Sequence, residues 1–167
     1  MHAPLIVSVS GLRGVVGTSL TADVAARYAA AFADGLPAGP IVIGRDGRQS
    51  GPLLATAITE LLVGSGRDVI DCGVAATPTV GVAIRDRRAA GGIQISASHN
   101  PAEYNGLKLF SAAGRVLPAS EGAGVKARFE HLGSLPAPAA AAGRLREVDG
   151  TAAHVRLVAA TVDVAAI

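Results

Sequence analysis

The stretch Gly92-Ile-Gln-Ile-Ser-Ala-Ser98-His99-Asn100-Pro101 combines a short apolar strand with a polar turn. Ile93 and Ile95 supply the apolar side chains of the strand, and the turn carries a serine, a histidine and an amide to its tip. Ser, Asn and Pro all favour turns for backbone reasons, so the tip is also compatible with a turn that has no chemical role. The residues around this stretch decide between a structural turn and a reactive loop.

A lysine returns toward the same turn shortly afterwards, in the run Asn105-Gly106-Leu107-Lys108. Phosphoryl transfer onto a serine requires a hydroxyl nucleophile, a group that carries its proton and a fixed cation. Ser98, His99 and Lys108 are residues of these three kinds. A serine hydrolase is disfavoured because no Gly-x-Ser-x-Gly segment surrounds the serine. The sequence therefore favours a phosphoryl-transfer loop over a turn with no chemical role.

Strand and helix patterns alternate on both sides of this stretch. Buried strands are expected at 5–9, 41–43, 68–71, 93–95 and 107–110, with helices at 22–34, 50–64, 77–88 and 120–131. Thr21 and Thr77 are expected to cap the first and third of these helices, and Gly35 is expected to end the first. This order predicts a three-layer α/β/α domain, with a mixed sheet between two layers of helices.

The composition changes after this domain. Residues 1–132 are expected to form one domain, and residues 133–143 form an Ala/Pro-rich segment with few large apolar side chains. Such a segment is typical of a linker. Residues 144–167 resume a helix-compatible pattern, which predicts the start of a second domain or a terminal helix.

Charge and cysteine content exclude several function classes. The net charge is +2, and the densest basic group is Arg85, Arg87 and Arg88, without the interleaved aromatic residues that a nucleic-acid surface needs. Cys72 is the single cysteine, so no internal disulfide can form and a reducing compartment is expected. No apolar run is long enough to span a membrane. A cytoplasmic protein with no nucleic-acid partner and no membrane contact is predicted.

Three segments, in order along the chain, resemble motifs of the α-D-phosphohexomutases. Ile-Ser-Ala-Ser98-His99-Asn100-Pro101-Ala-Glu-Tyr-Asn105-Gly106-Leu-Lys108 resembles the active-site loop of that family. Ser10-Gly11-Leu12-Arg13-Gly14-Val-Val-Gly17 resembles its N-terminal loop, and Gly44-Arg45-Asp46-Gly47-Arg48-Gln-Ser50-Gly51 resembles its Gly-Arg-Asp-x-Arg segment. The family includes phosphoglucomutase, phosphomannomutase and phosphoglucosamine mutase. The match runs from about residue 5 to about residue 129 and implies that the chain is domain I of such an enzyme.

The resemblance also implies roles for individual residues. Ser98 would carry the phosphoryl group, His99 would orient groups around it, and Lys108 would act as general acid/base or as a phosphoryl clamp. Arg13, in a glycine-flanked loop, would bind phosphate oxygens with its forked guanidinium. Ser96 is expected only to bond the backbone at the strand end. Five further residues are expected to support the loop, although direct ligand contact by the Arg-Asp pair stays open: Arg45, Asp46, Arg48, Asn100 and Asn105.

The implied reaction moves phosphate between C1 and C6 of a hexose or hexosamine phosphate, through phosphorylated Ser98 and a bisphosphorylated sugar. A glucose 1,6-bisphosphate-type activator and Mg²⁺ are the implied cofactors, with an oxygen of the Ser98 phosphate as one metal ligand. The chain lacks the family's Asp-Gly-Asp-x-Asp metal loop, so the remaining mutase domains would have to act in cis or in trans. The chain alone is therefore expected to be a poor catalyst, and its motifs do not identify the sugar.

Two other classes of function stay open at this point. The chain could be a non-catalytic module that binds a sugar phosphate, since the metal loop is missing. It could also be an assembly module for a separately encoded remainder. Phosphorylation of the serine would separate both alternatives from a mutase domain.

Overall fold

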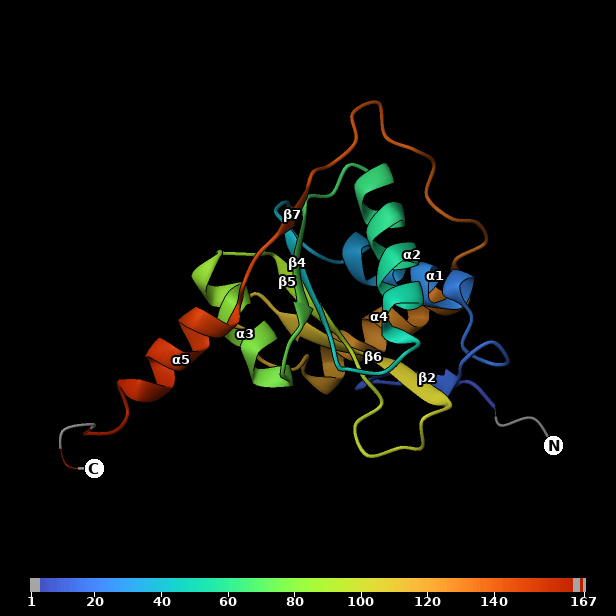
Figure 1. Ribbon diagram of the computed structural model, residues 1–167. Coiled ribbons are helices and arrows are strands. Elements are labelled where there is room, and N and C mark those ends of the chain that lie inside the picture. Colours follow the sequence, from blue (N-terminus) through green and yellow to red (C-terminus); the bar gives the residue numbers. More distant parts are fainter. Residues whose placement is uncertain (1–3, 164–165, 167) are drawn as a thin grey trace.

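The structure is a computed structural model that describes residues 4–163 and 166. Its described residues form one seven-stranded sheet in the order β1-β2-β6-β5-β3-β4-β7. Figure 1 shows α1 and α2 on one side of β4 and β5, and α3 on the other. The strands are β1 (Ile6–Ser8), β2 (Gly11–Val15), β3 (Ile41–Arg45), β4 (Val69–Val74), β5 (Gly91–Ile95), β6 (Tyr104–Ser111) and β7 (Leu145–Glu147). The helices are α1 (Ala22–Asp34), α2 (Gly51–Gly64), α3 (Thr77–Asp86), α4 (Ala119–His131) and α5 (Thr151–Ala159).

The sheet has a parallel half and an antiparallel half. Strands β5, β3, β4 and β7 pair in parallel, whereas β6, β2 and β1 pair antiparallel with their neighbours. The expected strands at 5–9, 41–43, 68–71, 93–95 and 107–110 all overlap observed strands. The predicted mixed sheet is therefore confirmed.

Side chains alternate between the two faces of the sheet and build two separate apolar clusters. Ile41 and Ile43 of β3 are fully buried in the cluster that α1, α2 and α4 cover, whereas Val42 between them is buried in the cluster beneath α3. This alternation follows from the two-residue period of a strand. Helices on both faces confirm the expected three-layer α/β/α domain.

Helix ends agree with the sequence except at α3. The Thr21 hydroxyl accepts a hydrogen bond from the Val24 N–H at 3.2 Å, and Gly35 ends α1, as expected. Thr77 was expected to cap α3, which is wrong because Ala76 is the N-cap and Thr77 already lies in the first turn. Pro78 lies in the first turn, where no N–H donor is needed, and the helix ends at Asp86, two residues before the expected end.

One expected loop is a strand. Residues 10–17 were expected to form a glycine-flanked loop, but Gly11–Val15 is β2, which pairs with both β1 and β6. Gly11 has a φ of +135°, and a Cβ atom built there would clash with the Leu107 carbonyl oxygen. The glycine therefore serves a tight hairpin and a close strand approach, which the sequence alone did not distinguish from a loop.

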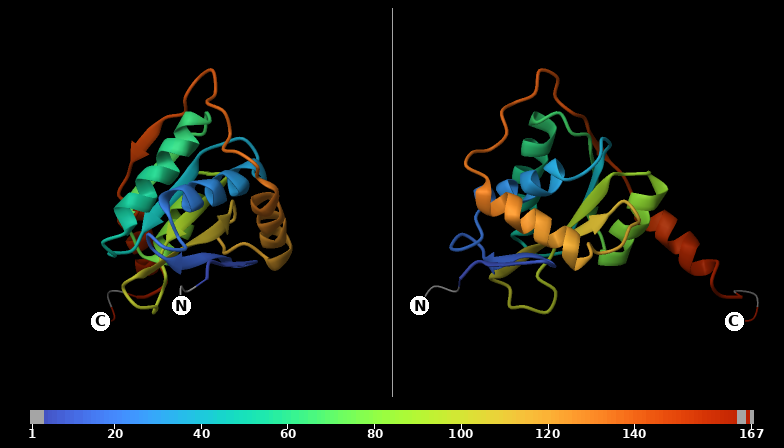
Figure 2. Two further views of the ribbon diagram at one scale, coloured as in Figure 1. Left: turned by 90° about the vertical axis from the view of Figure 1, so that its right-hand side faces the viewer. Right: turned by 180° about the vertical axis from the view of Figure 1, so that it is seen from behind.

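The C-terminal part of the described chain continues the same sheet. Residues 133–143 contain no helix or strand, and β7 then pairs in parallel with β4. Helix α5 contacts α3 and buries none of its residues; Figure 2 shows it extending away from the sheet. None of the helices in the described part of the chain has the length and apolar character needed to span a bilayer.

Candidate functional site

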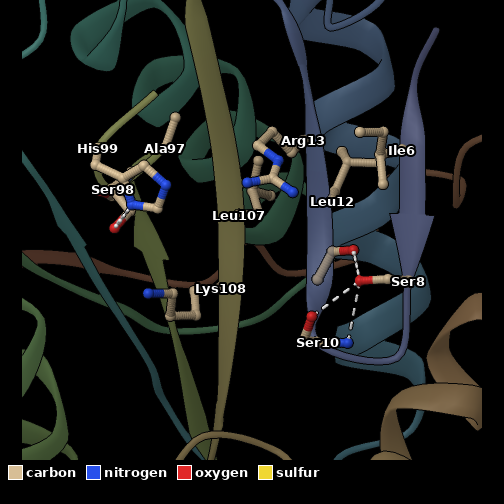
Figure 3. A pocket seen from close by; sticks show the side chains of 12 residues that line it. Ile6, Ser8, Ser10, Leu12, Arg13, Ala97, Ser98, His99, Leu107 and Lys108 are labelled. Atoms are coloured by element: carbon tan, nitrogen blue, oxygen red, sulfur yellow. Dashed lines mark hydrogen bonds between the residues drawn. The ribbon is translucent and has the colours of Figure 1, made fainter. Parts of the chain in front are cut away.

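A pocket of about 240 Å³ lies where β5 ends beside β6 and the β1–β2 hairpin (Figure 3). The polar side chains that line it come from all of these elements. They are Ser8, Ser10, Arg13, Ser96, Ser98, His99 and Lys108. The pocket thus brings together all four residues predicted to act on substrate, namely Arg13, Ser98, His99 and Lys108.

Strand register puts the two cations of the pocket on one face of the sheet. Arg13 of β2 lies opposite Gly106 of β6, and Lys108 lies two residues further along β6. Directly opposed residues point to the same face and so do residues two apart, so Arg13 and Lys108 are diagonal neighbours. Gly106 has no side chain to fill the space between them. Both cations are half-buried.

In the described part of the chain, no carboxylate lines this pocket. The ion pairs among the described residues are Arg48–Asp46, Arg87–Asp86 and Lys126–Glu130, so neither Arg13 nor Lys108 is neutralised by a described acidic side chain. Two cations in one concave site raise the local concentration of anions. The guanidinium can in addition bind two oxygens of a phosphate in a fork. The pocket is therefore suited to a phosphorylated or otherwise anionic ligand.

Ser98 has an unusual backbone conformation, with a φ of +55°. A left-handed serine is uncommon, and such a conformation persists only where the surroundings hold it. The Ser98 N–H donates to the Ser96 hydroxyl at 3.0 Å, which is the backbone-bonding role expected for Ser96. Both Ser98 and His99 are exposed at the mouth of the pocket.

The left-handed turn also decides where His99 points. Neighbouring residues of a strand point to opposite faces, and on that pattern His99 would face away from Ser98. The strand ends at Ile95, however, and the His99 Nδ1 atom lies 3.5 Å from the Ser98 Oγ atom (Figure 3). This is at the limit of a hydrogen bond and brings the imidazole within reach of the hydroxyl.

Arg48 lies under the loop that carries Ser98. Its Nη2 group donates to the carbonyls of Ser98 and Asn100, at 3.0 and 2.7 Å. Its Nη1 group donates to the carbonyls of Pro101 and Tyr104, at 2.7 and 3.0 Å. Its Nε atom donates to the Asp46 carboxylate at 3.2 Å. The Arg48 side chain is 15% exposed and Asp46 is 28% exposed, so this Arg–Asp pair is half-buried.

Two asparagines make further hydrogen bonds around the same loop. The Asn100 side-chain amide donates to the Ala97 carbonyl at 2.7 Å. Asn105 is fully buried, and its amide donates to the Ser50 hydroxyl at 2.9 Å, which ties the far end of the loop to the start of α2. Ser50 itself makes no side-chain cap at that helix.

Arg45 does not reach the pocket. It lines a separate cavity of about 570 Å³ at the carboxyl ends of β3 and β4, together with Asp71, Glu147 and Asp149. Cys72 also lines this cavity, and burial, followed by the nearby Asp71 charge, raises the pKa of its thiol to about 11. The thiol therefore holds its proton at neutral pH and is no nucleophile there.

The donor set of the pocket does not suit a divalent cation. Mg²⁺ prefers six oxygen ligands, with carboxylates among them, whereas the pocket offers hydroxyls, an imidazole and two cations. Within residues 4–163 and 166, no three His, Cys, Asp or Glu side chains form a group that could hold a metal. Phosphorylation of Ser98 would add metal-binding oxygens, but carboxylates would still be lacking.

Sequence reasoning missed three serines. Ser8 and Ser10 line the pocket, and their hydroxyls lie 2.9 Å apart at the hairpin turn. Ser50 is the N-cap of α2, as expected, but its hydroxyl accepts from Asn105 instead of capping the helix. Two serines spaced by one residue before a glycine were the available signal for the hairpin. The Ser50 contact joins residues 55 positions apart, and nothing local predicts it.

Comparisons with known proteins identify a family for most of this chain. A family model described as phosphoglucomutase/phosphomannomutase, alpha/beta/alpha domain I, matches residues 5–135. A phosphoglucosamine mutase of Rhodococcus erythropolis is 40% identical over 149 residues, covering 85% of this chain and 34% of that protein. A phosphoglucosamine mutase of Alkaliphilus metalliredigens is 46% identical over 112 residues, covering 65% and 25%.

Solved structures of similar proteins have the same fold. A candidate phosphomannomutase from Thermus thermophilus superposes with a TM-score of 0.84 at 30% identity, covering 99% of this chain and 38% of that chain. A phosphoglucomutase/phosphomannomutase family protein from Burkholderia thailandensis gives a TM-score of 0.76 at 29% identity, covering 93% and 35%. The chain thus spans about a third of the length of such proteins.

Proposed function

The chain belongs to the phosphoglucomutase/phosphomannomutase family, as its domain I, and from this premise we propose that Ser98 is the phosphoserine of a phosphohexomutase. The observation that carries the proposal is the pocket itself. A serine hydroxyl at its mouth stands with Arg13 and Lys108, two cations without a carboxylate partner among the described residues. Phosphoryl transfer depends on such positioning and charge stabilisation rather than on covalent chemistry by other side chains.

The proposed reaction begins with phosphorylated Ser98 and a hexose or hexosamine phosphate. A sugar hydroxyl oxygen attacks the phosphorus; the new P–O bond forms as the bond to Ser98 Oγ breaks. Lys108 gives a proton to the Ser98 oxygen as it leaves and takes up the proton of the attacking hydroxyl, so its own protonation is the same before and after the step. The bisphosphorylated sugar then turns round, and its other phosphoryl group returns to Ser98 by the reverse steps. Phosphate has then moved between C1 and C6.

Each lining residue has a part in this proposal. Arg13 holds phosphate oxygens through its fork and offsets the charge that spreads over them. Lys108, as general acid/base, exchanges the proton with the sugar oxygen. His99 orients the groups around Ser98, and its 3.5 Å approach to the Ser98 oxygen supports that part. A sugar bisphosphate of the glucose 1,6-bisphosphate type would load Ser98 before the first turnover.

The proposal also includes Mg²⁺ and further mutase domains, neither of which is part of the described structure. The resemblance implies that a metal takes an oxygen of the Ser98 phosphate and offsets its charge. Its carboxylate ligands would come from remaining mutase domains, in cis or in trans, which fits the 34% coverage of the Rhodococcus protein. Domain bounds of 1–132, a linker at 133–143 and a further unit from 144 stay predictions, as does a cytoplasmic location.

The relatives favour one sugar class without deciding it. The two proteins compared in sequence carry the name phosphoglucosamine mutase, which makes a glucosamine phosphate the first substrate to try. Glucose and mannose phosphates are the next, because the family model covers both phosphoglucomutases and phosphomannomutases.

A chimaera tests the proposal. The chain replaces the matching third of the Rhodococcus erythropolis protein, and the product is incubated with labelled glucose 1,6-bisphosphate before phosphopeptide mapping. Label on Ser98, lost in Ser98→Ala and kept in Ser96→Ala, supports a mutase domain. Label on Ser96 would overturn the assignment. Binding of sugar phosphate without any label would make the chain a binding module instead.

A further inference from the structure

We propose that Arg48 is the positioning residue for the Ser98 loop, and that it holds the left-handed conformation of Ser98 without touching substrate. The importance of Ser98 rests on the proposed function above, whereas the action of Arg48 on the loop does not. The resemblance left open whether this arginine supports the loop or binds the ligand. The hydrogen bonds of its guanidinium decide between the two.

The donors of Arg48 are all in use. A guanidinium has five N–H donors and no acceptor. One donor is on Nε and goes to Asp46, two on Nη1 go to Pro101 and Tyr104, and two on Nη2 go to Ser98 and Asn100. A phosphate oxygen could bind only in exchange for one of these partners. Arg48 is thus saturated, in contrast to Arg13, whose side chain has no hydrogen-bond partner among the described residues.

Little apolar burial holds the exposed part of the loop. Ser98, His99, Pro101, Ala102 and Glu103 are all exposed, whereas Ala97 is buried. Apart from the bonds of Ser96, Asn100 and Asn105, the hydrogen bonds of Arg48 therefore hold most of the exposed part of the loop. The four carbonyls that Arg48 binds span the loop from Ser98 to the first residue of β6. A single side chain therefore fixes the beginning, the middle and the end of the loop.

Asp46 fixes Arg48 in turn. The Asp46 N–H donates to the Ile95 carbonyl at 3.0 Å, at the last residue of β5 before the loop. The Asp46 carboxylate accepts from both the Nε and the backbone N–H of Arg48, at 3.2 and 3.1 Å. Asp46 therefore fixes the position of the Arg48 guanidinium relative to the end of β5, where the loop begins.

Arg48 acts on the orientation of the Ser98 hydroxyl through the Ser98 carbonyl. Ser98 has a φ of +55°, which a serine adopts only under external constraint. Arg48 holds the carbonyl of this same residue at 3.0 Å and so fixes the peptide plane between Ser98 and His99. That plane sets where both side chains point into the pocket. Without it, Ser98 is expected to relax to an ordinary φ and to move its hydroxyl relative to Arg13 and Lys108.

Arg67 offers a matched control, because it makes the same kind of contact elsewhere. Its guanidinium donates to four backbone carbonyls at the end of α1 and the loop that follows it, those of Ala33, Leu36, Pro37 and Gly39. It does not line the pocket that holds Ser98. Arg48→Met and Arg67→Met thus each remove four guanidinium–carbonyl hydrogen bonds. Only Arg48→Met removes bonds to the Ser98 loop.

The first experiment uses the unphosphorylated chain and needs no turnover. The Cα and carbonyl carbon shifts of Ser98 report its φ, and hydrogen exchange reports opening of residues 98–105. In Arg48→Met, Ser98 shifts are expected to move to ordinary values, and the loop amides to exchange at least about tenfold faster, whereas Arg67→Met changes neither. If Arg48→Met does not fold, Arg48→Lys and Asp46→Asn carry the same comparison. Unchanged Ser98 shifts in a folded variant overturn the proposal.

The second experiment separates positioning from ligand binding. In the chimaera, the rate of phosphoserine formation is expected to fall in Arg48→Lys, while the affinity for glucose 6-phosphate stays near the parent value. A loss of affinity with a normal rate shows direct ligand contact and overturns the proposal. If the parent chimaera forms no phosphoserine, the proposed function fails, but the Ser98 shifts still decide the role of Arg48.

Discussion

Arg13 lies directly opposite Gly106 in the pairing of β2 with β6, so the guanidinium side of β2 meets a residue without a side chain. A Cβ atom built on Gly106 would clash with the Leu12 carbonyl oxygen and lie 3.2 Å from the Ser96 carbonyl oxygen and 3.4 Å from the Cα atom of Arg13. Gly106 thus lets three segments of backbone meet beneath the pocket. The position of Arg13 depends on that close approach.

Gly106→Ala is therefore expected to push β2 away from β6. Overpacking of this kind costs about 1–3 kcal/mol of the free energy of unfolding, and the shift should also weaken binding of inorganic phosphate at Arg13. Gly64→Ala is the matched control, because nothing lies within 4 Å of a Cβ atom at that helix end. It should be neutral or stabilising by up to about 1 kcal/mol. Urea unfolding measures both, and equal stabilities would contradict the packing argument.

Alkaline pH should destabilise the fold through two buried acids. Burial raises the pKa of the Cys72 thiol from 9.0 to about 11 and that of the Tyr28 hydroxyl from 10.0 to about 12. Above about pH 9 the unfolded chain releases these protons while the folded chain keeps them. The resulting stability is therefore full below pH 9 and is lost as pH rises toward 11 and 12. Each group contributes at most about 2–3 kcal/mol.

Urea unfolding between pH 8 and pH 11 checks this expectation, with the slope of stability against pH as the readout. Cys72→Ala and Tyr28→Phe should each flatten the slope, even where they change stability at pH 8. Tyr28→Phe gives the clearer test, because the Tyr28 hydroxyl has no hydrogen-bond partner within the described part of the chain. Slopes equal to that of the parent chain would contradict the pKa shifts.

Most of the fold could be predicted because its signals are local. The apolar run Ile41 to Ile43 lies between Gly/Pro turns, which indicates a strand. Tyr28 and Phe32 are spaced by four residues, which indicates the buried face of a helix. β2 was not predicted because the three glycines between Ser10 and Gly17 are typical of a loop, although Gly11 serves the close approach of β2 to β6. β7 escaped because its three exposed residues gain their place only by pairing with β4.

The site was partly predictable for a different reason. Ser98, His99 and Lys108 lie within one loop and the next strand, so sequence proximity brings them together. Arg13 joins them only through the register of β2 with β6, and the donor saturation of Arg48 depends on contacts across more than 50 positions. The left-handed φ of Ser98 likewise has no local signal in the sequence.

The chain by itself should bind Mg²⁺ weakly. Among the described residues, no carboxylate lines the pocket. Hydroxyl groups and water alone do not provide the octahedral set of oxygen ligands that Mg²⁺ requires. Titration calorimetry is expected to show no site tighter than roughly micromolar. Glu103→Gln removes the single carboxylate of the Ser98 loop and should change nothing. Tight binding that this variant abolishes would reveal a metal ligand within the loop.

Lys108 and Arg13 should differ in what their substitution costs, although both are cations of one pocket. Lys108→Arg keeps the charge but replaces a group that can release a proton by one that stays protonated. If Lys108 is the general acid/base, turnover of the chimaera should fall by about two to four orders of magnitude with little change in substrate affinity. Arg13→Lys keeps the charge and loses the fork, so its cost should appear in the affinity for sugar phosphate.

Pre-steady-state rates and substrate affinities of both variants separate these roles. The two effects are expected to be distinct because proton transfer acts on the transition state, whereas the fork of Arg13 holds phosphate oxygens in the ground state as well. Near-normal turnover in Lys108→Arg would reduce Lys108 to an electrostatic clamp. The proton would then have to pass through His99, whose Nδ1 atom lies 3.5 Å from the Ser98 hydroxyl, or through a group that another domain supplies.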